Sequence, residues 1–226
     1  MKIWVIIPAY NESQELARVL DELKQENLSV LVVDDGSEDD TYQIATDKAD
    51  HAIKNEKNLG KGMSLKKGIK YLLKNADFDY VFTMDADGQH SPFDVKQFLF
   101  QAQQGENFVV GNRMNDPSGM PKLRVFINNL MSWVISHQAH QKIPDTQCGF
   151  RLIRRDVLER IQINANKFEI ESEIIIKASR LGIKIKSIPV KSIYFKNRES
   201  KIRPFVDTVR FVRFMFRLRN EKSRTI

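Results

Sequence analysis

The chain has one cysteine, Cys148, among its 226 residues, which excludes an internal disulfide and any metal site built from several cysteines. It also has no apolar run long enough to cross a membrane. Hydrophobic residues make up 42% of the sequence and charged residues 29%, a balance typical of water-soluble globular proteins. The apolar start at residues 3–7 is too short for a signal peptide. We therefore expect a cytoplasmic protein with one main domain.

Excess charge is absent from most of the chain. Residues 196–226 contain ten Lys and Arg against three Asp and Glu, whereas residues 1–195 contain 26 of each sign. The whole net charge of +7 therefore lies in the C-terminal segment. This argues against a generally basic nucleic-acid-binding surface, so no nucleic-acid partner is expected, and it favours one basic surface element.

Short apolar segments alternate with helical patterns along the chain. Strands are expected at 3–7, 30–33, 51–54, 80–84, 108–110 and 183–195, and helices at 13–25, 39–48, 60–74, 91–103, 123–138 and 168–181. Ser91 is the expected cap of its helix, with Pro92 at the first position. Pro189 interrupts the last strand, which favours a place at the sheet edge. The pattern predicts an α/β fold with a mostly parallel central sheet and helices on both faces.

Two carboxylates follow the strand at 80–84. Asp85 and Asp87 stand one residue apart at the end of an apolar strand, where they repel each other and lose hydration. A cation between them relieves both effects, and Mg²⁺ or Mn²⁺ suits hard oxygen ligands. Such an ion completes its shell with water and substrate phosphates, so the motif predicts a phosphate-bearing ligand as well as a metal. An acidic turn containing Gly88 is the alternative interpretation.

Polar clusters also follow the first two expected strands, at residues 8–12 and 34–41. In open parallel sheets, ligands bind outside the carboxyl ends of the strands. We therefore expect the clusters at 8–12, 34–41 and 85–87 to share one cleft.

Seven motifs follow one another along the chain: PAYNE (8–12), DDGSEDDT (34–41), NLGKG (58–62), DADGQ (85–89), GNR (111–113), DTQCGFR (145–151) and RESK (198–201). Their order resembles that of glycosyltransferase family 2, in particular the branch of dolichol-phosphate mannose synthases and bacterial polyprenyl-phosphate glycosyltransferases. The resemblance implies a nucleotide-diphospho-sugar transferase (GT-A type) catalytic domain over residues 1–202, followed by a basic amphipathic helix and tail over 203–226.

The resemblance implies an inverting, divalent-metal-dependent transfer of a sugar from a nucleotide-sugar donor to a polyprenyl phosphate. The residues then expected to bind substrates are Pro8, Tyr10, Glu12, Asp34, Asp35, Lys61, Asp85, Arg124, Arg198, Ser200 and Lys201. The residues expected to act in the reaction are Asp87, Arg113 and Asp145. The residues expected to bind Mg²⁺ or Mn²⁺ are Asp85, Asp87 and Gln89. Tyr10 and Glu12 would contact the nucleoside, and Asp35 would recognise the base or ribose.

Several of these residues have a simpler alternative role. Lys61 is equally well explained as a solvated lysine in the first turn of its helix. Surface arginines are the alternative for Arg113 and Arg124, and turn formation after a proline is the alternative for Asp145. For residues 39–41 we favour helix capping, and Gly36 is expected to serve a backbone turn.

The acceptor decides which chemistry is needed. A hydroxyl acceptor requires a general base, whereas a polyprenyl phosphate is already anionic and instead needs cations near it. By resemblance, the loop with Arg198, Ser200 and Lys201 supplies them, although Glu199 stands where the family usually has glycine. Two other functions stay open: a soluble family 2 enzyme acting on a saccharide or protein hydroxyl with Asp145 as base, and a non-catalytic nucleotide-sugar-binding subunit.

Two amphipathic segments predict contact with a further surface. The helix expected at 205–219 is apolar on two faces and basic on a third. One apolar face would pack on the domain, and the other would meet the cytoplasmic face of a membrane or a membrane partner subunit. A helix that packs in a dimer or on the domain alone is the alternative. The helix at 123–138 carries Phe126, Ile127, Leu130, Trp133 and Val134 on one side. This side either packs on the core or adds to the same surface.

Overall fold

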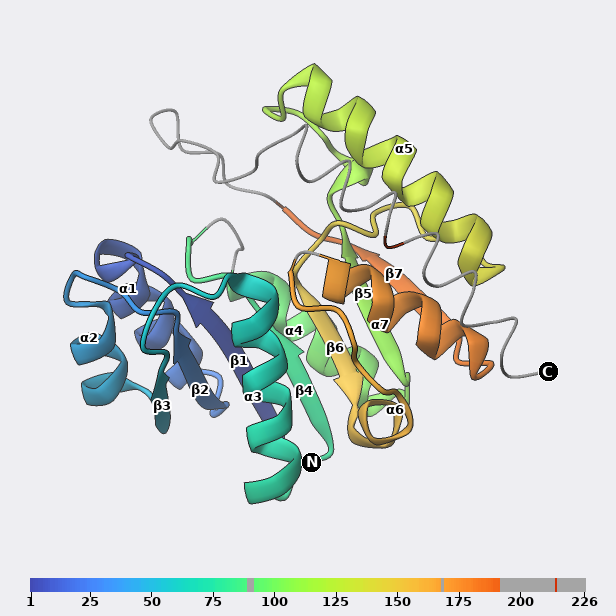
Figure 1. Ribbon diagram of the computed structural model, residues 1–226. Helices are drawn as coiled ribbons and strands as arrows, with labels where there is room; N and C mark the ends of the chain where they lie inside the picture. The colour runs from blue at the N-terminus through green and yellow to red at the C-terminus, as the bar shows by residue number, and fades with distance from the viewer. Residues whose placement is uncertain (89–91, 168, 192–213, 215–226) are drawn as a thin grey trace.

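The computed structural model describes residues 1–88, 92–167, 169–191 and 214, whose strands form one seven-stranded sheet in the order β3-β2-β1-β4-β6-β5-β7 (Figure 1). The strands are β1 (Ile3–Ala9), β2 (Ser29–Asp34), β3 (His51–Lys54), β4 (Tyr80–Thr83), β5 (Phe108–Asn112), β6 (Arg151–Arg154) and β7 (Ile185–Pro189). The helices are α1 (Ser13–Lys24), α2 (Thr41–Lys48), α3 (Lys61–Asn75), α4 (Pro92–Gln103), α5 (Lys122–Ala139), α6 (Arg155–Arg160), α7 (Glu169–Arg180) and the short 3₁₀ helix η1 (Arg113–Asn115).

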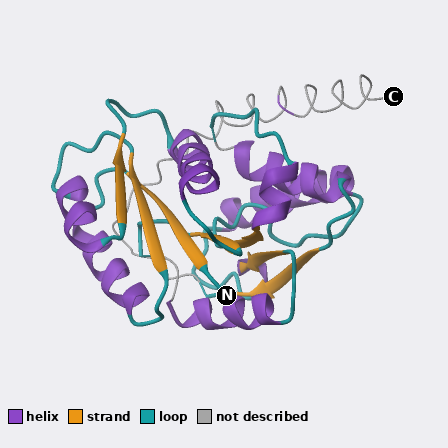
Figure 2. Cartoon of the chain, turned by 90° about the horizontal axis from the view of Figure 1, so that it is seen from below, coloured by secondary structure: helices purple, strands orange, loops and turns teal. Residues whose placement is uncertain are grey.

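The first four strands form a parallel half of the sheet, as the sequence predicts. β1 pairs with β2 and β4, and β2 pairs with β3, all in parallel. Helices cover both faces of the sheet (Figures 1 and 2). Ile6 on β1 touches the α3 face, while Phe82 on β4 packs against Phe98 of α4 on the other. Because both faces are covered, β1, β2 and β4 are largely buried and read as continuous apolar runs, whereas β3 at the sheet edge is only half-buried or exposed.

The second half of the sheet is mixed and contains a strand that the sequence did not predict. β6 runs antiparallel to β4 and β5, and β5 pairs in parallel with β7. The first residue of β6 is the charged Arg151, which is only 1% exposed. Its guanidinium donates hydrogen bonds to the carbonyls of Cys148, Thr146 and Glu171 at 2.6–2.8 Å. These bonds offset the cost of burying a charge in the sheet, and they explain why an arginine-flanked segment forms a central strand.

The last strand lies at the edge of the described sheet, as its proline indicates. β7 is shorter than expected, because it begins at Ile185 and ends at Pro189. The rest of the expected strand and the helix predicted at 205–219 lie outside the described residues, apart from residues up to 191 and Phe214. Phe214 is buried within the hydrophobic core.

The carboxylate of Asp39 accepts hydrogen bonds at the start of two helices in the parallel half. Asp39 accepts hydrogen bonds from the backbone N–H of Ser13 at 3.2 Å and of Thr41 at 3.0 Å, the first residues of α1 and α2. Burial by itself raises the pKa of Asp39, but the hydrogen bonds from Thr41 and Ser13 outweigh it and lower the pKa to about 2. Capping is therefore confirmed for Asp39, whereas Asp40 makes no side-chain cap hydrogen bond. Gly36 has the positive φ of +77° that its predicted turn requires.

Candidate active site

The carboxyl ends of β1 and β2 are joined into one structure. The backbone N–H of Asp35 donates to the carbonyl of Ala9 at 2.7 Å. Asn11 donates its N–H to Ser37 Oγ at 2.9 Å, and its side-chain Oδ1 accepts from the N–H of Glu38 at 3.0 Å. The two polar clusters predicted to share a cleft are therefore in direct contact.

The start of α3 joins this structure through Asp35. Asp35 Oδ1 accepts hydrogen bonds from Asn55 Nδ2 at 2.8 Å, Ser64 Oγ at 3.0 Å and the N–H of Leu59 at 3.0 Å, and Oδ2 accepts from the N–H of Gly60 at 2.7 Å. Four protein donors thus hold this buried carboxylate. Asp35 fixes the loop at the N-terminus of α3, a structural role that the sequence did not predict.

The polar cluster at residues 85–87 contacts α3 through an ion pair between Asp85 and Lys61. Lys61 Nζ lies 2.7 Å from Asp85 Oδ1 and 3.0 Å from Glu171 Oε1. Burial by itself lowers the pKa of Lys61, but the two carboxylates outweigh it and raise the pKa above its ordinary value. Only 26% of the side chain is exposed, so the alternative of a solvated first-turn lysine is wrong. Lys61 is a fixed positive charge between the end of β4 and α7.

Gly149 packs directly against this ion pair. A Cβ atom built on Gly149 would lie 2.9 Å from Lys61 Nζ and 3.0 Å from Asp85 Oδ2. The first contact is shorter than real Cβ atoms show, and the second is tighter than nine in ten real Cβ contacts. The bare backbone of the segment before β6 therefore lets Lys61 and Asp85 approach each other.

The acidic residues after β4 fit a partial metal shell. Asp85 and Asp87 supply the oxygen ligands that Mg²⁺ and Mn²⁺ prefer. Across the described ranges 1–88, 92–167 and 169–191 with residue 214, no group of three or more His, Cys, Asp or Glu side chains is placed to hold an ion. An ion bound here would therefore take the rest of its shell from water and a bound phosphate group. Gln89, the third residue of the predicted set, lies outside the described residues.

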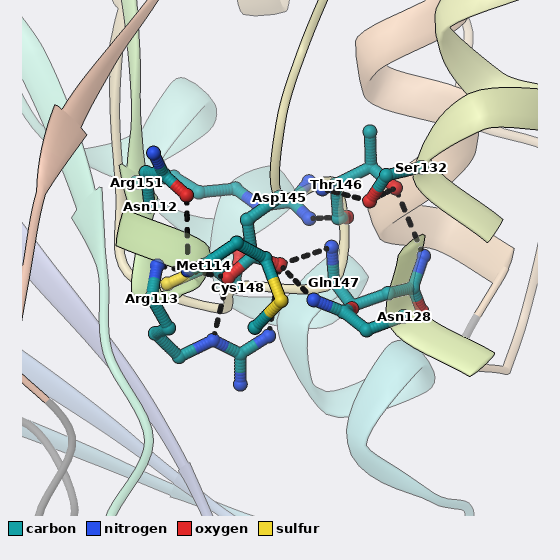
Figure 3. A network of polar contacts seen from close by, with 10 residues as sticks. All are labelled: Asn112, Arg113, Met114, Asn128, Ser132, Asp145, Thr146, Gln147, Cys148 and Arg151. Atoms are coloured by element: carbon teal, nitrogen blue, oxygen red, sulfur yellow. Dashed lines mark hydrogen bonds and ion pairs between the residues drawn. The ribbon is translucent and has the colours of Figure 1, made fainter. Parts of the chain in front are cut away.

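A buried ion pair stands at the end of β5 (Figure 3). Arg113 Nε lies 2.7 Å from Asp145 Oδ2, and its Nη2 lies 3.0 Å from Oδ1. The backbone N–H of Arg113 also donates to Oδ2 at 3.1 Å, and Oδ1 accepts from Asn128 Nδ2 and from the N–H of Gln147, both at 3.1 Å. The bond from Gln147 is the turn role foreseen as the alternative for Asp145. The same carboxylate also fixes the guanidinium of Arg113 through two parallel bonds.

These contacts make Asp145 a poor general base. Burial by itself raises the pKa of Asp145, but hydrogen bonds and charge from Arg113, with a hydrogen bond from Asn128, outweigh it and lower the pKa below its ordinary value. An effective base needs a pKa near the working pH. Asp145 is fully buried and its oxygens already accept five hydrogen bonds. The geometry suits the positioning of Arg113 and not the removal of a proton from a hydroxyl.

The inner face of α5 supports this network (Figure 3). Asn128 contacts Asp145, and one turn later Ser132 Oγ lies 3.1 Å from Thr146 Oγ1 and accepts from the N–H of Thr146 at 2.9 Å. Arg124 lies in the first turn of α5 and is half-buried. Neighbouring Cys148 is fully buried, and burial raises the pKa of its thiol to about 12, so this thiol is neutral.

The remaining predicted site residues have the following places. Pro8 and Tyr10 are half-buried and Glu12 is buried at the end of β1, and Asp34 is fully buried at the end of β2. Arg198, Ser200 and Lys201 lie outside the described residues. Sequence reasoning missed Asn55, Ser64 and Asn128, and it did not foresee the contact of Gly149 with Lys61 and Asp85. Asn55 directly follows β3, so its place at the carboxyl end of a parallel strand was a usable signal.

Comparison with known proteins identifies the family. Residues 4–162 match the family described as Glycosyl transferase family 2. The chain belongs to glycosyltransferase family 2. It is 30% identical over 216 residues to the UDP-N-acetylglucosamine–dolichyl-phosphate N-acetylglucosaminyltransferase of Methanococcus voltae, covering 85% of this chain and 86% of that one. It is 28% identical over 216 residues to the undecaprenyl-phosphate mannosyltransferase of Micrococcus luteus, covering 89% and 88%.

Solved structures show the fold of this glycosyltransferase. The chain superposes on glucosyl-3-phosphoglycerate synthase from Mycobacterium tuberculosis, solved with Mn²⁺ and UDP-glucose, with a TM-score of 0.69. The match covers 88% of this chain and 72% of the synthase at 20% identity. The predicted GT-A fold is thereby confirmed.

Proposed function

We propose that this family 2 glycosyltransferase transfers a sugar, with inversion, from a nucleotide-sugar donor to a polyprenyl phosphate. The observation that carries the proposal is the meeting of three strand ends at the start of α3. Asp35 holds the loop before α3, while Lys61 in its first turn holds Asp85. Hydrogen bonds and an ion pair therefore connect the polar residues from the end of β2 to the end of β4, which supports a single donor site along these strand ends.

In the proposed complex, the nucleoside lies at the ends of β1 and β2. Tyr10 and Glu12 contact it from the β1 side, on the loop whose entry Pro8 fixes. Asp34 and Asp35 form the wall on the β2 side, where Asp35 is already rigid because four donors hold it. A rigid wall favours binding because little order has to be gained when the donor arrives.

The diphosphate lies beside the acidic residues after β4. Asp85 and Asp87, with Gln89, would hold Mg²⁺ or Mn²⁺, and this ion supplies Lewis-acid stabilisation of the diphosphate charge. The mycobacterial synthase, which shares the fold, was solved with Mn²⁺ and UDP-glucose. Lys61 orients Asp85 toward this subsite through their 2.7 Å contact.

The acceptor assignment follows from the state of Asp145. A hydroxyl acceptor needs a base, and the buried carboxylate of Asp145 has a lowered pKa and five hydrogen bonds. A phosphate oxygen is already a nucleophile and needs none. It attacks C1 of the sugar, the bond from C1 to the donor phosphate breaks, and the electron pair leaves with the nucleoside diphosphate.

Cations must bring the two anionic substrates together. Arg113, held rigid by Asp145, is the described residue proposed to contact a phosphate, with Arg124 nearby in sequence on α5. Arg198, Ser200 and Lys201 are proposed to complete the acceptor site. The Methanococcus voltae and Micrococcus luteus relatives are named for dolichyl-phosphate and undecaprenyl-phosphate acceptors, which supports the same class of acceptor here.

Association with the cytoplasmic face of a membrane is part of this proposal, because a long polyprenyl phosphate resides in a bilayer. Across the described residues, no helix of sufficient length and hydropathy for a membrane span is found. The basic segment 203–226 is the proposed attachment, either to the bilayer itself or to a membrane partner subunit.

A transfer assay tests the proposal. The purified protein is incubated with radiolabelled UDP- and GDP-sugars and Mg²⁺ or Mn²⁺, in parallel with a short-chain polyprenyl phosphate and with 3-phosphoglycerate. We expect label to enter the organic phase with at least one donor and only with the polyprenyl phosphate. Transfer to 3-phosphoglycerate alone, or hydrolysis of donors without any transfer, would contradict the acceptor assignment.

A further inference from the structure

Helix α5 is built with two unlike faces. Its buried residues are Asn128, Ser132, Ile135 and Ala139, which recur at helical spacing and face the site network. Its exposed apolar residues are Leu123, Phe126, Ile127, Leu130 and Trp133, which also recur at helical spacing and lie on the opposite side. We call these five side chains the α5 stripe.

The exposed apolar side chains of the α5 stripe are clustered and not isolated from one another. In the part of the chain that the structure describes, eight large hydrophobic side chains are exposed, and five of them belong to the stripe. Leu123 and Trp133 are each 69% exposed and Phe126 is 65% exposed. Contiguous apolar surface of this kind marks an interaction site, whereas isolated exposed residues need no explanation. Met131 and Val134 of the same helix instead pack on the core.

The charged residues near the α5 stripe are basic, which favours an anionic partner. Between Asp116 and Asp145 the sequence has no Asp or Glu, but it has Lys122, Arg124 and Lys142. Basic residues therefore stand at both ends of α5. If two copies met through their stripes, either a parallel or an antiparallel arrangement would bring like charges together. An anionic bilayer surface matches the charge at both ends.

We propose that α5 lies in the surface of an anionic bilayer, with the α5 stripe in the boundary between headgroups and acyl chains. Phe126, Leu130 and Trp133 supply apolar area, and an indole is favoured at this depth because its ring is apolar and its N–H is polar. Lys122 and Lys142, which are exposed near the two ends of α5, contact lipid phosphates. This surface is separate in sequence from the basic segment 203–226, so α5 is a second and independent contact.

The placement also connects the bilayer to the reaction, and this step rests on the proposed function. Asn128 on the inner face bonds Asp145, and Asp145 holds Arg113. One helix diameter, about 10 Å, therefore separates the acyl boundary from the cationic group proposed to meet the acceptor. A lipid phosphate at headgroup depth would reach the site without leaving the membrane.

Trp133 gives a direct test, because the chain has only two tryptophans. Trp4 stacks on His51 in the parallel half, with ring centroids 5.5 Å apart, so Trp4→Phe keeps a stacked ring and leaves Trp133 as the sole indole. Vesicles of phosphatidylglycerol and phosphatidylcholine, without polyprenyl phosphate, are added to this variant. We expect the emission of Trp133 to shift to shorter wavelength and to be quenched by lipids brominated on the upper acyl chain. Vesicle binding that leaves Trp133 emission unchanged would overturn the proposal, since the contact would then be made elsewhere.

Sedimentation with the same vesicles gives an independent measurement. Phe126→Ser combined with Trp133→Ser removes two aromatic side chains from the stripe, and at least about a tenfold loss of vesicle affinity is expected. Phe100→Ser is the matched control, because Phe100 is 55% exposed on α4, outside the stripe. Equal vesicle binding by the double variant and the control would overturn the proposal. So would a stripe-dependent dimer, seen by analytical ultracentrifugation, in a protein that does not bind vesicles.

The transfer assay separates this inference from the proposed function. The double variant should keep its activity on a short-chain acceptor in solution and lose at least about tenfold in activity on a long-chain acceptor in vesicles. Full activity in vesicles would overturn the role of the stripe while leaving the proposed function intact. Absence of transfer by the unmodified protein on either acceptor would contradict the proposed function, and the Trp133 measurement would still decide whether α5 enters the bilayer.

Discussion

The two halves of the sheet use buried carboxylates in different ways. In the parallel half, Asp35 accepts hydrogen bonds from neutral groups and fixes a loop, so its carboxylate has a structural task. In the mixed half, Asp145 accepts most of its bonds from one arginine and holds a cation at a defined place. Under the proposed function, the rigid residues of the parallel half would bind the donor, whereas the cation held in the mixed half would face a second anion.

Asp145→Asn is expected to have the largest effect, because it leaves the buried guanidinium of Arg113 without its charge partner. Breaking a buried ion pair from one side typically costs about 3–5 kcal/mol. We expect the free energy of unfolding at pH 7 to fall by about 3 kcal/mol in urea denaturation. An unchanged midpoint would show that Arg113 does not depend on this carboxylate.

The pH dependence of the same variant sharpens the result. The pKa of Asp145 is lowered in the folded protein, so its contribution to stability is fully present above the unfolded value of about 4. It is lost as the pH falls through the lower folded value. The stability difference between the wild type and Asp145→Asn should therefore shrink only below about pH 4. A difference that disappears near neutral pH would contradict this account of the ion pair.

Gly149→Ala tests where the two halves meet. The added Cβ would lie within 3.0 Å of Lys61 Nζ and Asp85 Oδ2, so these flexible groups must move apart. We expect kcat/KM for transfer to fall up to about tenfold, because Lys61 and Asp85 move by a few tenths of an ångström and a misplacement of about 1 Å can cost about a hundredfold. Stability should change little. Gly105→Ala is a useful contrast, because Gly105 has φ +78° and open space around it; this variant should lose stability and keep activity. Equal activities of the two variants would argue against a role for the Lys61 contact.

Asp39→Ala should have the smallest effect and is confined to the parallel half. Loss of a cap that serves both α1 and α2 is expected to lower the free energy of unfolding by about 1 kcal/mol at pH 7. Because the folded pKa of Asp39 is about 2, below its ordinary value, the difference from wild type should persist above about pH 4 and vanish as the pH approaches 2. Thermal melts at several pH values measure it, and a difference that grows on acidification would contradict the capping role.

The parallel half could be predicted because most of its strands have a recognisable sequence pattern. β1, β2 and β4 are short apolar runs, each followed by a helical pattern, and strand-end motifs then fall at one edge of the sheet. β6 could not be predicted in this way, since Arg151 interrupts the apolar pattern and its burial depends on three carbonyls supplied by distant segments.

The same contrast holds for the site. The sequence pointed to Asp85, Lys61 and Asp35, but not to the partners that fix them. Glu171 lies 110 residues from Lys61 in the chain, and no local pattern relates the two. The five bonds of Asp145 were equally hidden, and they argue against the base role that it has in the alternative with a hydroxyl acceptor.

Calorimetric titration of a sugar nucleotide, with and without Mn²⁺, tests the central claim most directly. For the wild type we expect Mn²⁺ to strengthen binding at least about tenfold, because the ion would bridge the acidic residues after β4 and the diphosphate. For Asp87→Asn, shown to be folded by its thermal melt, the strengthening should be absent. Equal strengthening in both proteins, or no binding of any sugar nucleotide by the wild type, would contradict the account.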